Sequence, residues 1–222
     1  MRIGILISTI CFIISIPVFL VSTDLRLAVN DVRLYEYGFS KYDVSLNTGI
    51  PDDELRDIAL EIIEYYNSDE EFLDVDIYGE REMLHMKDVK GLVRLDYTVQ
   101  MFTLGYIALY IIVGFIVKRG MFWKNLVSGL FWGSWLGISL IIVIGLWAII
   151  DFNTLFYLFH LLSFSNELWQ LSQSDQLLLM FPQGFFMEAA LFVAGAVILQ
   201  SLLILLSAWG ILRIRKRFKA KV

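Results

Sequence analysis

The sequence has very little of the side-chain chemistry on which most enzymes depend. It contains one cysteine, Cys11, and two histidines, His85 and His160, among 222 residues. A single cysteine excludes a disulfide framework and a cysteine-based metal cluster. The sequence also lacks a G-x-S-x-G nucleophile motif, a phosphate-binding loop and a dinucleotide fingerprint. Serine-hydrolase, P-loop nucleotide and nicotinamide chemistry are therefore not indicated.

Charge is absent from long parts of the chain. Apolar residue types make up 58% of the sequence, whereas soluble domains usually contain about 45–50%. At 1.5 Å per residue, a helix needs about 20 apolar residues to cross the roughly 30 Å of bilayer hydrocarbon. Four uncharged runs meet this length, at residues 3–21, 99–117, 126–150 and 189–212. The first run resembles a signal peptide, but no A-x-A cleavage site follows it, so we expect an uncleaved anchor.

The charged residues are segregated along the chain in a way that predicts orientation. Lys118, Arg119 and Lys124 lie between the second and third apolar runs, and residues 213–222 contain six further basic side chains. Residues 23–97 contain 19 acidic and 8 basic side chains. Because cytoplasmic loops are enriched in lysine and arginine, we expect loop 118–125 and both termini to be cytoplasmic. Residues 23–97 are then extracellular.

The extracellular region has the pattern of a small α+β cap. Pro51 followed by three acidic residues is typical of a helix start. Apolar residues then recur at helical spacing, at Leu55, Ile58, Ala59, Ile62, Ile63 and Tyr66. Two other stretches alternate as strands do, at residues 32–39 and 72–78. We therefore predict one helix and a few strands in this region.

The segment after the third apolar run is too short to cross the bilayer. Residues 152–164 are strongly apolar, but such a run of 13 residues is more typical of an interfacial or re-entrant helix. Residues 172–175 can cap a second short helix at residues 176–181, which Pro182 ends.

The resulting fold class is an α-helical membrane protein with four transmembrane helices, an extracellular α+β cap and a re-entrant or interfacial helical segment. The predicted parts are a first transmembrane helix (1–22), the cap (23–97), the second and third helices with their cytoplasmic loop 118–125 (98–150), the interfacial segment (151–183), the fourth helix (184–212) and the basic cytoplasmic tail (213–222).

The two histidines are the candidate chemical groups, and their positions allow two interpretations. Both are expected on the outer side, close to a membrane boundary, where they would be either a proton-transferring pair or two unrelated hydrogen-bonding residues. Asp88, three residues after His85, is either a group that orients the imidazole or a solvated carboxylate. A zinc site formed by both histidines and a carboxylate would lack the usual H-x-x-x-H or paired-cysteine spacing.

An ordered set of motifs resembles the lipoprotein intramolecular transacylase family of bacterial integral membrane proteins. The set consists of His85-Met86-Lys87-Asp88-Val89-Lys90, Phe159-His160, Phe164-x-Asn166-x-x-Trp169, Asp175 and Phe181-Pro182-x-x-Phe185. Each motif is weak alone, but the ordered set is fairly specific, and the resemblance covers nearly the whole chain. The resemblance also includes four helices with an external cap.

The resemblance implies acyl transfer within one substrate molecule in the bacterial cell membrane. The sn-2 acyl chain of a diacylglyceryl-modified cysteine would move to the α-amine of the same cysteine, to give a lyso-form lipoprotein. His85 and His160 would be catalytic, one as a base and the other stabilising the oxyanion or protonating the leaving oxygen. Supporting or substrate-binding roles would fall to Asp88, Lys90, Phe159, Phe164, Asn166, Trp169, Asp175, Phe181 and Phe185.

The implied partners are diacylated lipoproteins and membrane lipids, without a metal or an organic cofactor, because the substrate carries both reacting groups. The basic tail is interpreted as a topology determinant rather than a nucleic-acid site. The alternative function is a non-enzymatic membrane scaffold or sensor whose acidic cap binds an extracellular partner. An ionisable residue inside the short apolar segment, His160, favours the enzyme, since a scaffold has little need of it.

Overall fold

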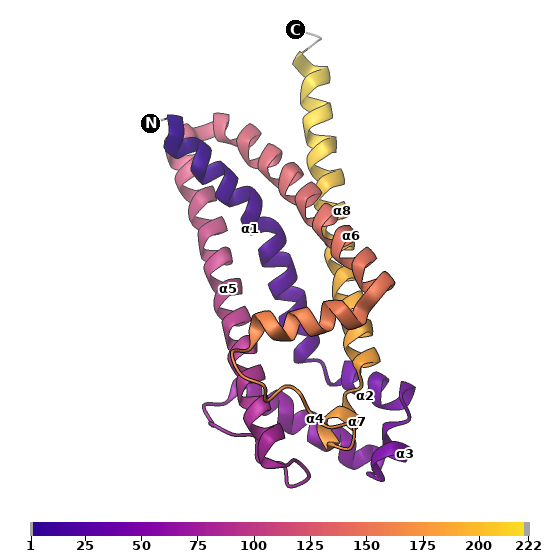
Figure 1. Ribbon diagram of the computed structural model, residues 1–222. Helices are drawn as coiled ribbons and strands as arrows, with labels where there is room; N and C mark the ends of the chain where they lie inside the picture. The colour runs from indigo at the N-terminus through magenta and orange to yellow at the C-terminus, as the bar shows by residue number, and fades with distance from the viewer. Residues whose placement is uncertain (1, 220–222) are drawn as a thin grey trace. The chain divides into compact units, whose positions relative to one another are not determined.

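The computed structural model describes residues 2–219, with side chains described for residues 3–213. Figure 1 shows that the described chain is almost entirely helical, and residues 2–219 contain no β-strand. The elements are α1 (Arg2–Val29), α2 (Val32–Lys41), α3 (Val44–Thr48), α4 (Asp52–Asn67), α5 (Glu80–Lys118), the 3₁₀ helix η1 (Arg119–Met121), α6 (Phe122–Ser163), α7 (Gln176–Met180) and α8 (Gln183–Lys219). The predicted basic tail beyond Arg213 lies outside the described side chains.

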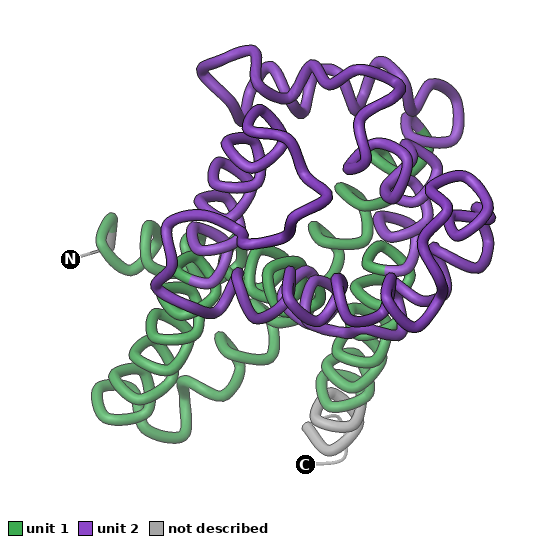
Figure 2. The backbone as a smooth tube through the Cα atoms, turned by 90° about the horizontal axis from the view of Figure 1, so that it is seen from below, with its two compact units in different colours: residues 1–24, 98–146, 193–222 green, residues 25–97, 147–192 purple. Residues whose placement is uncertain are grey.

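The chain divides into two compact units, which Figure 2 colours separately. Unit 1 contains residues 1–24, 98–146 and 193–222, and unit 2 contains residues 25–97 and 147–192. Both histidines belong to unit 2. The four long helices each contribute residues to both units.

Unit 1 is a bundle of apolar helices held by close packing and by a few polar pairs. Helices α1 and α5 run antiparallel, because Thr9 lies 3.3 Å from the hydroxyl of Tyr110 and Gln100 donates to Thr23 at 3.1 Å. Helix α6 approaches α1 through glycines at four-residue spacing. A Cβ on Gly129 would come within 2.7 Å of a ring carbon of α1. Small residues of this kind allow helices to pack closely in a membrane.

Three helical stretches are long and apolar enough to cross a membrane, at Ile3–Val29, Glu80–Ser163 and Gln183–Arg213. The second stretch contains both α5 and α6, joined by η1. Only 17–22% of the residues in the most apolar part of each stretch are buried in the isolated chain, as expected for helices whose outer surface contacts lipid. The chain is therefore an integral membrane protein, and a total of four crossings stays a prediction.

Unit 2 has its own hydrophobic core, built around helix α4. The predicted helix is confirmed, because α4 begins directly after Pro51 and has three acidic residues in its first turn. Its buried face is the one that the spacing predicted and includes Leu55, Ile58 and Ile62. Side chains of α2, α5 and α7 join this core, among them Tyr35, Met86 and Met180.

The strand predicted at residues 32–39 is wrong, since these residues form helix α2. Asp31 caps the helix by accepting the backbone N–H of Arg33 at 3.1 Å. The buried residues Tyr35, Gly38 and Phe39 lie three and four positions apart, which is helical spacing. The alternating composition is compatible with the two-residue period of a strand and with the 3.6-residue period of a helix. The Asp31 cap and the packing of the buried side chains favour the helix. At Gly38 the helix meets the ring of Phe185, so closely that a Cβ would lie 2.2 Å from a ring carbon.

The strand predicted at residues 72–78 is also wrong, because this segment is an irregular loop before α5. Leu73, Val75 and Tyr78 are buried, and the N–H of Tyr78 closes a turn on the carbonyl of Val75 at 3.1 Å. The alternation therefore reflects burial of every second or third side chain against the core, with no partner strand among the described residues. The cap of the described chain is helical rather than α+β.

Helix α6 changes direction at Asp151, where the backbone leaves helical geometry (φ −153°, ψ 78°). The Asp151 carboxylate accepts the backbone N–H of Thr154 at 3.1 Å and so caps the continuing helix. The short apolar segment predicted at 152–164 is this continuation, which ends at Ser163. His160 therefore lies in unit 2, on the part of α6 that follows the break at Asp151.

Candidate functional site

His85 lies in the second turn of helix α5 and is only 8% exposed. The helix begins at Glu80, and Glu82 accepts the N–H of Gly79, which satisfies one of the amides that a helix start leaves unpaired. Nδ1 of His85 is buried and has no hydrogen-bond partner. A buried imidazole nitrogen without a partner is costly in a folded protein, so it marks this position as one that a ligand can complete.

His160 lies near the end of helix α6 and is also 8% exposed. Its Nδ1 is 2.7 Å from the carbonyl oxygen of Phe156, one turn earlier. A carbonyl oxygen only accepts, so Nδ1 of His160 carries the proton in this hydrogen bond. Nε2 of the neutral ring is then left with a free lone pair.

The two histidine rings lie close to each other. Their centroids are 6.3 Å apart, with an angle of 30° between the ring planes. Phe164 contacts both of them, at 5.2 Å from the His85 ring and 5.6 Å from the His160 ring. Further aromatic rings surround His160, at centroid distances of 4.4 Å for Phe156, 5.0 Å for Trp169 and 5.3 Å for Phe159.

Burial favours the neutral form of both histidines. They lie outside the apolar runs 99–117 and 126–150. Burial lowers the pKa of His85 to about 4, the neighbouring His160 adds to the effect, and the carboxylate of Asp88 opposes it. Burial likewise lowers the pKa of His160, while the hydrogen bond to the Phe156 carbonyl opposes the change. Desolvation disfavours the charged imidazolium in each case.

The loop between α6 and α7 is tied to helix α5 on either side of His85. Asn166 donates to the carboxylate of Asp88 at 2.8 Å, three residues after His85. Arg81, four residues before His85, donates to the carbonyl of Glu167 at 2.6 Å. These bonds hold the loop that carries Trp169 beside the histidine pair.

This arrangement suits proton transfer in an apolar setting. It offers one imidazole with a free lone pair and a second neutral imidazole that can donate an N–H. Rings on several sides limit the access of water to these groups, which strengthens electrostatic interactions with a reacting atom. Among the described residues, no three histidine, cysteine, aspartate or glutamate side chains form a cluster of metal ligands.

Comparison with protein families gives the site its context. The model of the family described as lipoprotein intramolecular transacylase Lit matches residues 10–186, which include both histidines and the loop between them. The chain belongs to the lipoprotein intramolecular transacylase family. It is therefore a membrane transferase whose family acts on lipoproteins, as the sequence motifs indicated. No curated protein matches the chain significantly.

Solved structures of a transacylase from this family have the same fold. The in meso structure of the membrane integral lipoprotein intramolecular transacylase Lit from Bacillus cereus is 24% identical, with a TM-score of 0.81. The match covers 96% of this chain and 97% of that protein. Two structures of the Bacillus cereus protein with one histidine replaced, by arginine or by alanine, match with TM-scores of 0.77. At this identity, the likeness establishes the fold.

The remaining predicted site residues fall into two groups. Phe159, Phe164, Asn166 and Trp169 lie in or beside the histidine site, as described above. Lys90 lies elsewhere, because its ammonium group donates to the carbonyl of Glu70 at 2.6 Å and packs 4.0 Å from the centre of a tyrosine ring of α4.

The predicted residues around helix α7 have structural contacts. Asp175 precedes α7, and its carboxylate accepts the N–H of Ser172 at 2.7 Å. Phe181 and Phe185 are buried in the core of unit 2, with ring centroids 5.3 Å apart. They contact α2 rather than either histidine ring, since both pack against Tyr35.

Three residues that hold the site were not predicted from the sequence. Phe156 fixes the tautomer of His160 through its backbone, Arg81 binds the loop, and Glu82 bonds helix α7 as well as its own helix start. Glutamate at the third position of a helix is a recognisable capping signal, but the start of α5 was not predicted.

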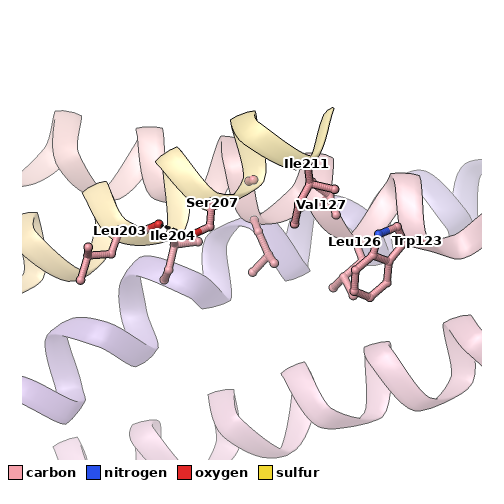
Figure 3. Close-up of a pocket in the computed structure, with 9 residues that line it drawn as sticks. Trp123, Leu126, Val127, Leu203, Ile204, Ser207 and Ile211 are labelled. Atoms are coloured by element: carbon pink, nitrogen blue, oxygen red, sulfur yellow. Dashed lines mark hydrogen bonds between the residues drawn. The ribbon is translucent and has the colours of Figure 1, made fainter. Parts of the chain in front are cut away.

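A separate apolar pocket lies in unit 1, between helices α6 and α8 (Figure 3). Its volume is about 320 Å³, and residues such as Trp123, Leu126, Leu203 and Ile211 line it. Neither histidine lines this pocket. Its lining is apolar apart from Ser207, whose hydroxyl donates to the carbonyl of Leu203 at 2.7 Å within helix α8.

Proposed function

We propose that this transacylase moves the sn-2 acyl chain of a diacylglyceryl-modified cysteine to the α-amino group of the same cysteine. The product is a lyso-form lipoprotein with an N-acyl chain. The observation that carries the proposal is the pair of buried, neutral histidines 6.3 Å apart and surrounded by aromatic rings, in a chain of this family. The aromatic rings are suited to contact the acyl chains of a lipid substrate.

His160 is assigned as the base. The hydrogen bond from its Nδ1 to the Phe156 carbonyl supports this role, because it leaves the Nε2 lone pair free and stabilises the imidazolium that forms. As the neutral amine attacks the acyl carbon, Nε2 takes the proton from the attacking nitrogen. The same imidazolium then protonates the glyceryl oxygen as the carbon–oxygen bond breaks, so the protein ends each cycle unchanged.

His85 is assigned as the donor to the oxyanion. Its lowered pKa keeps the ring neutral, so an imidazole N–H can donate to the negative oxygen that develops on the acyl carbon. A neutral imidazole in this role does not hold the substrate as an ion pair. Its contribution is therefore largest in the transition state, which is the condition for catalysis.

Positioning supplies much of the remaining rate. The attack closes an eight-membered ring through nitrogen, the two cysteine carbons, sulfur, two glyceryl carbons, the ester oxygen and the acyl carbon. Medium rings close reluctantly, and good orientation of the reacting groups contributes about 7–11 kcal/mol in favourable cases. The rigid aromatic surroundings of the histidines support this function.

We further propose four membrane crossings, with both termini cytoplasmic and residues 23–97 outside.

Mass spectrometry of a lipoprotein's N-terminal lipopeptide tests the reaction. The chain is expressed in a bacterial host that leaves its lipoproteins diacylated with a free amine, beside His85→Ala and His160→Ala variants. Transfer keeps the total mass, so fragmentation must locate one acyl chain on nitrogen and one on glycerol. We expect this isomer with the wild-type protein only. A free-amine lipopeptide in cells that contain folded, inserted wild-type protein would overturn the proposal.

A further inference from the structure

We infer that Glu82 is a positioning residue of the transacylase, which sets the separation of the two histidines by holding helix α7 to helix α5. This inference rests on the proposed function, because the consequence of the separation is measured on acyl transfer. Glu82 lies three residues before His85 on the same helix, and its carboxylate bonds backbone amides rather than either histidine ring.

The Glu82 carboxylate is buried and fully engaged by backbone amides. Its side chain is 6% exposed. One oxygen accepts the N–H of Gly79 at 2.6 Å, at the start of its own helix α5. The other oxygen accepts the N–H of Leu177 at 2.7 Å, in the first turn of α7. Burial of a carboxylate costs several kcal/mol unless hydrogen bonds compensate for it, and these two bonds provide the compensation.

One side chain thus caps two helices that are distant in sequence. The first amides of a helix have no partner within the helix. In α7 the residue at the capping position, Asp175, forms no side-chain cap, because it bonds Ser172 instead. Glu82 replaces the missing cap from the neighbouring helix. Glu82 of α5 therefore helps to position the N-terminus of α7.

A continuous series of ring contacts connects α7 to His160. Phe181 follows α7 directly, and its ring lies 5.3 Å from that of Phe185. The series continues through Phe186 to Phe156, at 5.4 Å and 5.3 Å, and Phe156 lies 4.4 Å from His160. Glu82 is also linked directly to His85, which lies one helical turn further along α5. A change at Glu82 is therefore transmitted to both partners of the pair.

The role of Glu82 is geometric rather than electrostatic. The charged or titrating groups that act on His85 are His160 and Asp88. Glutamine has the size of glutamate but only one acceptor atom, so its amide group faces one of the two N–H groups and cannot accept from it. Glu82→Gln therefore removes one helix cap while it preserves the volume of the side chain.

The test compares three variants of the full-length protein in detergent–lipid micelles, with a diacylated free-amine lipopeptide as substrate. Glu82→Gln is the test variant. Glu80→Gln is the matched control, since Glu80 is an exposed carboxylate in the same helical turn. Leu55→Ala destabilises the core of unit 2 without touching α5 or α7 caps, and it controls for a general loss of stability.

We expect Glu82→Gln to lower kcat about 10- to 100-fold, since a displacement of about 1 Å costs this much in a positioned reaction. The apparent KM should stay within about twofold. A second readout is the rate at which diethyl pyrocarbonate modifies each histidine, measured by peptide mass spectrometry. Glu82→Gln should change the modification rate of His85 several-fold, whereas Glu80→Gln and Leu55→Ala should leave it near the wild-type value.

Two further results separate this inference from the proposed function. If wild-type protein is active, His85→Ala is inactive and Glu82→Gln equals Glu80→Gln in both readouts, the inference is wrong and the proposed function stands. The inference is also wrong if Leu55→Ala reproduces the loss of kcat below its unfolding temperature. Inactive wild-type protein overturns the proposed function itself, and histidine modification then still reports whether Glu82 positions His85.

Discussion

Replacement of His85 by alanine, asparagine and glutamine tests the proposed division of roles between the two histidines. Alanine removes the imidazole N–H, whereas the amides of asparagine and glutamine keep an N–H near the position of one or the other ring nitrogen. His85 is buried, and its Nδ1 has no partner in the protein. None of these changes therefore breaks a hydrogen bond of Nδ1 within the fold.

The expected magnitudes follow from the two roles. Loss of one oxyanion donor costs about 10²–10³ in kcat, or roughly 3–4 kcal/mol. We expect this loss for His85→Ala and a loss of only about tenfold for the better of His85→Asn and His85→Gln. Which amide performs better identifies the nitrogen that donates. At position 160 an amide cannot act as a base, so His160→Gln and His160→Ala should lower kcat equally, by about 10²–10⁴.

Single-turnover acyl transfer in micelles measures these losses, with the N-acyl isomer quantified by fragmentation. Thermal unfolding of each variant shows whether the protein is folded at the assay temperature. Equal activity of His85→Ala, His85→Asn and His85→Gln, together with substantial activity of His160→Gln, would refute the assignment. The two histidines would then have the opposite roles.

Three further predictions concern pH, packing and the core of unit 2. The pKa of His85 is about 4 and that of His160 is also lowered, so the substrate amine is the group that must still lose a proton near neutral pH. The rate of acyl transfer should therefore rise with pH up to the amine pKa of about 7.7–8. A pH–rate profile with its midpoint at about 6.5, the ordinary pKa of histidine, would contradict this. Phe164→Leu should lower kcat about tenfold in the micelle assay, since Phe164 contacts both histidine rings, and unchanged kcat would show that its ring does not position them. Gly38→Ala should destabilise the protein by about 1–3 kcal/mol, because its Cβ would overlap the buried Phe185 ring. Gly91→Ala is the control, since the space around Gly91 is open. Equal unfolding temperatures of the two variants would disprove the overlap.

The same lowered pKa predicts how stability depends on pH. In the unfolded chain a histidine titrates near pH 6.5, whereas folded His85 titrates at about 4. The unfolded state therefore binds more protons between these values. The contribution of His85 to stability is complete above pH 6.5 and is lost as the pH falls towards 4.

Much of the fold was predictable because local signals agreed with the final packing. Helix α4 has a proline start, an acidic first turn and a regular apolar face, and all three appear in the structure. Helix α7 was predicted to end before Pro182, and it does. The apolar runs are equally unambiguous, because length and lack of charge suffice to indicate helices for a membrane.

One of the two wrong strands arose where a short pattern fitted two periods. Residues 32–39 fitted a strand and a helix equally, and the cap at Asp31 together with the close approach of Phe185 to Gly38 favours the helix. In the site, the histidine pair was predicted, but Glu82 and Arg81 were not. The bonds by which they join α5 to α7 and its preceding loop reach backbone groups about 90 residues away, and a sequence pattern carries no information about such distant amides and carbonyls.

An isotope crossover experiment tests the central claim of transfer within one substrate molecule most directly. Purified protein is given two diacylated lipopeptides together, one with deuterated acyl chains and one with a ¹³C-labelled peptide. The account predicts N-acylated products in which deuterated chains occur only on unlabelled peptide and ordinary chains only on labelled peptide. Products that carry a deuterated chain on the nitrogen of a labelled peptide would contradict it, since the acyl group would then have passed between molecules.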